Sequence, residues 1–147
     1  RSLYTFWRRT VGPANMFDTS NRQACRVRQS QTSTPLHALT MLNDPTWVEA
    51  ARVLAAKSIK GAPTLNERLI FAFRHVVGRS VGKQELVVLA RAFEKQKSLF
   101  EKDAAAARTL LSVGNAPLDE SIDPVECAAM THICLGIMNL DEALTRE

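Results

Sequence analysis

The sequence is poor in cysteine, and its three cysteines fit no familiar haem or zinc pattern. The 147 residues hold Cys25, Cys127 and Cys134, with no CxxC or CxxCH motif. The missing CxxCH excludes covalent c-type haem in this chain, and no clear zinc ligand set is present. Cys127 and Cys134 lie in one predicted helix, about 10 Å apart at ~1.5 Å per residue, which is too far for a disulfide. A disulfide would therefore join Cys25 to one of them, whereas the alternative that we favour is three buried free thiols.

Long apolar runs are also missing. No stretch approaches the roughly 18 consecutive apolar residues of a membrane span, so we expect no membrane insertion. No signal-peptide pattern is visible, and the chain opens mid-stream at "RSLYTFWRRT". We interpret it as a fragment of a longer protein. A hydrophobic fraction of 46% and a charged fraction of 23% are ordinary for one globular domain of this length.

The common catalytic motifs are absent as well. The sequence contains no Gly-rich phosphate loop, no GxSxG elbow and no HExxH pair. The histidines His37, His75 and His132 each stand without a partner at metal-ligand spacing. His132 lies between Cys127 and Cys134, but these three residues do not share one face of a helix. We therefore predict no catalytic residue, no metal and no cofactor in this chain.

What the sequence does have is an uneven distribution of charge. Residues 1–30 carry six arginines against one acid, and residues 119–147 carry seven acids against one base. One interpretation is that the two ends lie close together and compensate each other. The other is an anion-binding patch near the N-terminus.

The Arg-rich stretch "NRQACRVRQSQTSTP" is the best candidate for a binding site. If it is extended, Arg26 and Arg28 point the same way, and with Arg22 they could hold carboxylates, phosphates or sulfates. His37 follows shortly after and completes the predicted anion-binding set. The alternative is that these arginines pair with acids of a neighbouring domain or of the acidic C-terminal helix. We expect no nucleic-acid partner, because no reader fold is evident and the C-terminal end is acidic.

From Thr34 onward the sequence contains the residues that typically begin and end helices. Thr-Pro at 34–35, Asp-Pro at 44–45 and Asp-Pro at 123–124 each place an N-cap before a proline at the first helical position. "TLNE" is a capping box, and Gly61, Gly78 and Gly114 mark helix ends. The predicted helices are 35–43, 45–61, 65–77, one from Lys83 that continues or restarts at "AAAARTLL", and 124–138.

These elements predict an all-α fold, a single-domain bundle of about five helices. The last helix is apolar on nearly all sides, so we expect it to lie centrally. Residues 1–34 are rich in turn-forming residues and predict an irregular, partly extended arm that packs on the helical unit of residues 35–147.

Several long strings resemble one protein family. They are "RSLYTFWRRT", "NMFDTSNRQACRVRQSQTSTPLHALTMLNDPTWVEAARVLA", "ERLIFAFRHVVGR", "QELVVLARAF", "LLSVGNAPLD" and "LDEALTRE". Together they resemble the C-terminal, planctomycete-specific domain of planctomycete cytochrome c-linked proteins, a domain of unknown function. The resemblance covers essentially the whole chain. It departs at "SVGKQE", where the family more often has a Thr-Pro-type cap, which leaves that helix start open.

The resemblance implies a domain of a large exported protein, periplasmic or at the cell surface, with haem c held only in an upstream domain. It implies upstream domains of the same chain as partners, and an association with polysaccharide utilisation. The first hypothesis is a non-catalytic domain for docking or assembly, or one that supports a site completed upstream. The second is an enzyme or binding module for sulfated or acidic polysaccharide that uses Arg22, Arg26 and Arg28, with His37 as an acid or base.

Overall fold

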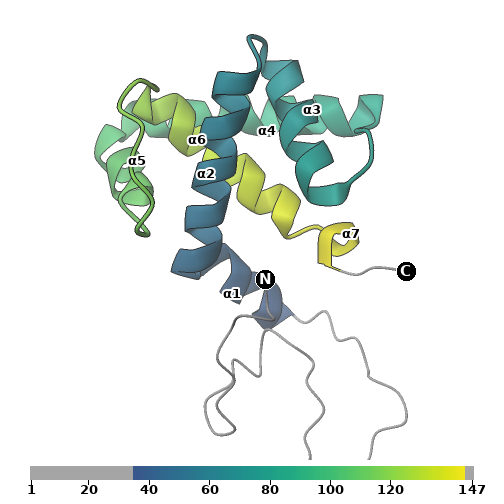
Figure 1. The fold of residues 1–147 in the computed structure, drawn as a ribbon, viewed down its shortest axis with the longest axis horizontal. Helices are drawn as coiled ribbons and strands as arrows, with labels where there is room; N and C mark the ends of the chain where they lie inside the picture. The colour runs from purple at the N-terminus through teal and green to yellow at the C-terminus, as the bar shows by residue number, and fades with distance from the viewer. Residues whose placement is uncertain (1–34, 145–147) are drawn as a thin grey trace, which may run out of the picture.

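The computed structural model describes residues 35–144, apart from the side chains of Leu36 and His37. Over this range every regular element is a helix, so the predicted all-α fold is confirmed (Figure 1). None of the described helices is long and apolar enough to cross a membrane. The helices are α1 (Pro35–Asn43), α2 (Pro45–Gly61), α3 (Leu65–Val77), α4 (Lys83–Lys102), α5 (Ala104–Leu111), α6 (Pro124–Met138) and α7 (Asp141–Leu144). The arm predicted for residues 1–34 lies outside the described residues and stays a prediction.

Three of the predicted helix starts are confirmed by their capping hydrogen bonds, whereas Thr34, the predicted cap of α1, lies outside the described residues. Asp44 Oδ1 accepts from the amide of Thr46 at 2.8 Å, and Asp123 Oδ2 accepts from that of Glu126 at 2.9 Å. Thr64 and Glu67 form the reciprocal capping box at the start of α3. Each cap satisfies amides that have no partner inside the helix, which fixes where the helix begins.

The segment after Lys83 resolves into two helices. Asp103 leaves helical geometry at φ −137° and ψ 78°, and its side chain accepts from the amide of Ala106 at 2.9 Å. The chain therefore restarts as α5 with a new cap. α5 ends at Leu111, before the predicted end at Gly114, which lies instead in the following loop with φ +93°. The end was wrong because the left-handed glycine serves a loop turn there and not a helix C-cap.

Helix α6 forms the centre of the fold, as predicted. It contacts all six of the other described helices, with α2 in front of it and α4 behind it in Figure 1. Ala128 and Ala129 are fully buried, and small side chains at these positions let neighbouring helices approach closely. The Thr131 hydroxyl is also buried and donates to the carbonyl of Cys127 at 2.7 Å, so it carries no unpaired donor into the core.

Candidate functional site

The residues predicted to bind anions mostly lie beyond the described part of the chain. Arg22, Arg26 and Arg28 fall outside the described residues, so their placement stays a prediction. His37 lies in α1, but its side chain is among those that are not described.

Both described histidines are held by contacts with neighbouring groups in the fold. His75 Nδ1 lies 2.9 Å from the carbonyl oxygen of Phe71, and its ring stacks on the Phe71 ring with centroids 4.0 Å apart. His132 is half-buried beside Phe100, with Nδ1 3.1 Å from Gln96 Oε1. Burial lowers the pKa of His132, because the charged imidazolium loses hydration there. These contacts give both rings structural roles.

The described cysteines are free and buried thiols. Burial raises the pKa of Cys127 and raises that of Cys134 to about 12, so neither is poised as a thiolate. Over residues 35–144, His, Cys, Asp and Glu side chains form no group of three that could hold a metal ion.

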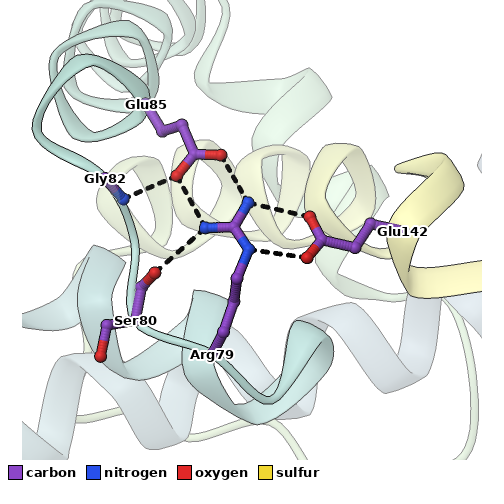
Figure 2. Close-up of polar contacts among 5 residues, drawn as sticks. All are labelled: Arg79, Ser80, Gly82, Glu85 and Glu142. Carbon is purple, nitrogen blue, oxygen red and sulfur yellow. Dashed lines mark hydrogen bonds and ion pairs between the residues drawn. The ribbon is translucent and has the colours of Figure 1, made fainter.

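The densest polar cluster in the described chain surrounds Arg79, just after α3 (Figure 2). Its guanidinium faces two carboxylates at once. Nε and Nη2 donate to Glu142 at 2.6 and 2.8 Å, while Nη2 and Nη1 donate to Glu85 at 2.6 and 3.0 Å. Nη1 also donates to the carbonyl of Ser80 at 3.0 Å, and the charged group lies 4.9 Å from the centroid of the Phe73 ring. Such paired forks fix the orientation of both partners.

Local sequence explains why these groups meet. Gly78 adopts φ +85° at the C-cap of α3, which turns the chain so that Arg79 leaves the helix axis. Gly82 then begins α4, and its amide donates to Glu85 Oε2 at 2.6 Å. Gly82 and Glu85 therefore form the start of α4, which the sequence did not define. The Glu85 carboxylate that caps this helix also accepts hydrogen bonds from Arg79.

The cluster shifts the titration of its members. Hydrogen bonds from Arg79 lower the pKa of Glu85 to about 2 and lower that of Glu142, and the two carboxylates raise the pKa of Arg79. All three side chains stay partly exposed, so solvent screens their attraction. The cluster of Arg79, Glu85 and Glu142, called the joint below, holds α7 against the turn between α3 and α4.

Other C-terminal acids also have partners within the helical unit. Glu126 accepts from Arg68 Nη1 at 2.6 Å, and Asp119 pairs with Lys60. Hydrogen bonds from Lys60 and then Ser121 lower the pKa of Asp119 to about 2. Three of the seven acids of residues 119–147 thus pair with bases of residues 60–79. The interpretation that the N-terminal arginines balance the acidic end stays a prediction, because those arginines lie outside the described residues.

A second polar arrangement joins α2 to the loop between α5 and α6. Glu49 Oε1 accepts from the backbone amide of Ala116 at 2.7 Å, and Arg52 Nη2 donates to the carbonyl of the same residue at 2.7 Å. Two side chains one helical turn apart on α2 therefore bind both backbone polar groups of Ala116, its amide and its carbonyl. Gly114 allows this approach, because a Cβ there would lie 2.5 Å from Glu49 Oε2.

Arg52 differs from the other described arginines by its burial. It is only 4% exposed, and its Nε is buried with no hydrogen-bond partner in the structure. Within residues 35–144 it makes one hydrogen bond, to a neutral carbonyl, and pairs with no carboxylate. A buried charge with so few partners is costly unless something else compensates it.

Arg52 lines a cavity of about 530 Å³ between α2, α5, the start of α6 and the loop that precedes it. The wall is largely apolar, with Leu111, Leu118, Ile122 and Cys127 among its members. Lys57, Lys60 and Arg108 add positive charge, and Asp119 and Glu120 add negative charge. A pocket of this size with a few polar groups on apolar walls has the usual form of a small-molecule site.

Sequence reasoning missed Arg52, although a signal was present. Val48, Arg52 and Ala55 follow the i, i+4, i+7 spacing of one helix face, and Val48 and Ala55 are buried. A single arginine on a buried apolar stripe is unusual and calls for a buried partner. The partner could not be read from sequence, because Ala116 lies 64 residues away and contributes only its backbone.

Helix α1 presents an exposed apolar face. Leu39 is 58% exposed and Leu42 is 41% exposed. Asn139, at the junction of α6 and α7, donates to the carbonyl of Ala38 at 3.4 Å, and the next residue, Leu140, is 39% exposed. Exposed leucines from two distant parts of the chain therefore lie in one region.

Comparison with known proteins gives a family and no function. Neither the curated proteins nor the solved structures yielded a match to this chain. The family model of PSD1, described as a protein of unknown function (DUF1553), matches residues 1–93. That match is continuous through α1, α2 and α3 and enters α4. The chain therefore belongs to the PSD1 family of proteins of unknown function (DUF1553).

Proposed function

We propose that this chain is a non-catalytic docking domain of a larger exported, haem c-linked protein. In this proposal the domain binds the part of the same protein that precedes α1, and it carries no haem itself. The exposed leucine face of α1 is the observation that carries the proposal. Isolated exposed leucines are common, but leucines gathered beside a helix junction are typical of a surface that another element covers.

The position of α1 in the chain favours upstream sequence as its partner. α1 is the first described helix, so the preceding chain is joined directly to its N-terminal end. The family match also runs without a break from residue 1 into α4, which makes the upstream stretch and α1 parts of one family unit. The exported, haem-linked context and a role in polysaccharide utilisation come from the resemblance in sequence, and they are parts of the proposal.

The test is hydrogen exchange on the intact protein. The variant Leu39→Asp with Leu42→Asp places two charges on the proposed docking face. We expect it to speed exchange in α1 and to expose the upstream junction to limited proteolysis, because burying unpaired carboxylates is unfavourable. An absorption spectrum of the intact exported protein checks the expected upstream haem c in the same sample.

A matched control uses α4, where Val87 is 59% exposed and Val88 is 65% exposed. Val87→Asp with Val88→Asp adds the same charges to apolar positions that are at least as exposed, and it should leave the junction protected. If both double variants behave alike, or if neither changes exchange in α1, the docking proposal is wrong.

A further inference from the structure

We propose that the cavity beside Arg52 binds a small organic anion with an apolar body, such as a carboxylate or a sulfonate. This inference concerns a different face from the docking surface of α1 and does not depend on it. The observations are the buried guanidinium with an unpartnered Nε, the apolar walls and the surplus of cations around the cavity.

The charge of the cavity favours an anion. Lys60 and Asp119 pair with each other, which leaves Arg52, Lys57 and Arg108 against Glu120. Arg52 is the buried member of this set, and its single acceptor in the described part of the chain is the neutral carbonyl of Ala116. Guanidinium groups form their strongest hydrogen bonds with carboxylates and similar oxyanions, so an anionic group here would complete the coordination of Arg52.

The walls favour an apolar body on that anion. Leu111, Ile122 and Pro124 line the cavity together with Val53 and Ala56 of α2. A bare inorganic anion would leave this apolar surface in contact with water. A molecule with a hydrocarbon or aromatic body would cover it and gain the free energy of apolar burial.

Two protein occupants are less suitable. The N-terminal stretch of residues 1–30 carries six arginines and would be repelled by the cations of the cavity. An acidic peptide would satisfy those cations but would leave the apolar walls without a matching partner. The small organic anion satisfies both features, and the acidic peptide becomes an outcome of the test.

The experiment compares two fluorescent probes on the intact protein. 8-Anilinonaphthalene-1-sulfonate and N-phenyl-1-naphthylamine share an apolar body, and only the first carries a negative charge. We expect the sulfonate to bind one site per chain and to bind more tightly than the neutral probe. Octanoate should displace it, whereas acetate, which lacks the apolar body, should not.

Variants locate the site. Lys57→Glu lies on the exposed rim and should weaken sulfonate binding by about tenfold, while the neutral probe changes by less than about twofold. Arg52→Met should act in the same direction. Ala56→Phe fills the cavity and should weaken binding of both probes. Lys95→Glu, which makes the same charge change on the exposed side of α4, is the matched control and should change neither affinity.

The outcomes decide the proposal. Equal affinity of both probes, or equal effects of Lys57→Glu and Lys95→Glu, would show that the charge of the cavity does not recognise the ligand and would overturn it. Displacement of the sulfonate by hexaglutamate at a lower concentration than octanoate would also overturn it, in favour of an acidic peptide. Near-ultraviolet circular dichroism of each variant identifies any that fails to fold, and Lys57→Glu keeps the test decisive if Arg52→Met does.

Discussion

Two arginines organise two regions of this molecule in opposite ways. Arg79 is partly exposed and makes five hydrogen bonds, four of them to the carboxylates of Glu85 and Glu142. Arg52 is buried and, within residues 35–144, makes one hydrogen bond, to a neutral carbonyl. The arginine that water could solvate has the full set of protein partners, and the one shielded from water has almost none.

This contrast separates a structural joint from a binding site. The partners of Arg79 come from the turn after α3, from α4 and from α7, and they use all of its donors, so the cluster holds α7 in place and needs no ligand. Arg52 has donors to spare at the edge of a cavity. A buried charge needs hydrogen-bond partners because water cannot reach it, whereas an exposed charge does not. A shortage of partners around a buried charge is therefore a better sign of a binding site than the number of hydrogen bonds alone.

The largest test of the contrast uses two glycines, Gly78 before Arg79 and Gly114 in the loop that Glu49 and Arg52 bind. Gly114 and Gly78 both have positive φ, but only Gly114 lies against a side chain, that of Glu49. Both alanine substitutions bear about 1–2 kcal/mol of backbone strain. Gly114→Ala should cost about 2 kcal/mol more, because it also displaces the bond from Ala116 to Glu49. Urea unfolding measures both, and equal losses would contradict the proposed role of Glu49 as a clamp.

A second test uses acid. The pKa of Glu85 is lowered from 4.5 to about 2 by Arg79, and that of Glu142 is lowered as well. Because these pKa values are lower in the folded state, the stabilisation is complete above about pH 4.5 and is lost as the pH falls toward 2. The free energy of unfolding of the wild type should therefore fall over this range more steeply than that of Arg79→Met. Arg91→Met, which removes an exposed arginine from α4, is the control and should keep the wild-type dependence of the free energy of unfolding on pH. If Arg79→Met also kept that dependence, the Arg79 cluster would not stabilise the fold in the way described.

A third test replaces Arg52 itself. In the absence of a ligand, Arg52→Met loses one hydrogen bond but removes a poorly compensated buried charge, and the two effects oppose each other. We expect the free energy of unfolding to change by less than about 1 kcal/mol. A loss of several kcal/mol in urea unfolding would mean that Arg52 serves mainly to hold Ala116, and the contrast with Arg79 would disappear.

The smallest expected effect is local. Glu142→Gln removes one carboxylate from the joint and should speed amide exchange in α7 alone, with little change in the melting temperature. Glu101→Gln, an exposed substitution of the same type on α4, is the control and should leave α7 unchanged. Faster exchange spread over α3 and α4 would show that the joint stabilises the whole fold and not only its last helix.

The fold was largely predictable from sequence because its signals are local. Asp44, Thr64 and Asp123 cap helices within three residues of themselves, and α6 shows its central position by being apolar on nearly every face. The restart at Asp103 was left open, since an aspartate inside a charged helical stretch also fits a continuous helix. The short α7 follows α6 so closely that no separate signal marks it.

The polar sites were not predictable, because they depend on partners far away in the chain. "AFRHVVGR" and "LDEALTRE" both belong to the strings that resemble the family, but nothing in the sequence predicts that Arg79 of the first contacts Glu142 of the second. The partner of Arg52 is a backbone carbonyl, which leaves no trace in residue identity. The anion site predicted at Arg22, Arg26, Arg28 and His37 remains a prediction beside the new one at Arg52.

The central position of α6 has a consequence for the order in which the fold can be completed. α6 is the sixth of seven described helices, so the apolar faces of α2, α3, α4 and α5 are synthesised before the helix that covers them. The segment that defines the family match ends at residue 93 and does not contain α6. During synthesis the surfaces of α2 and α3 that pack on α6 stay uncovered until α6 is made, and uncovered apolar surface of this kind favours aggregation. Completion of the fold is thus a late event that depends on the arrival of residues 124–138.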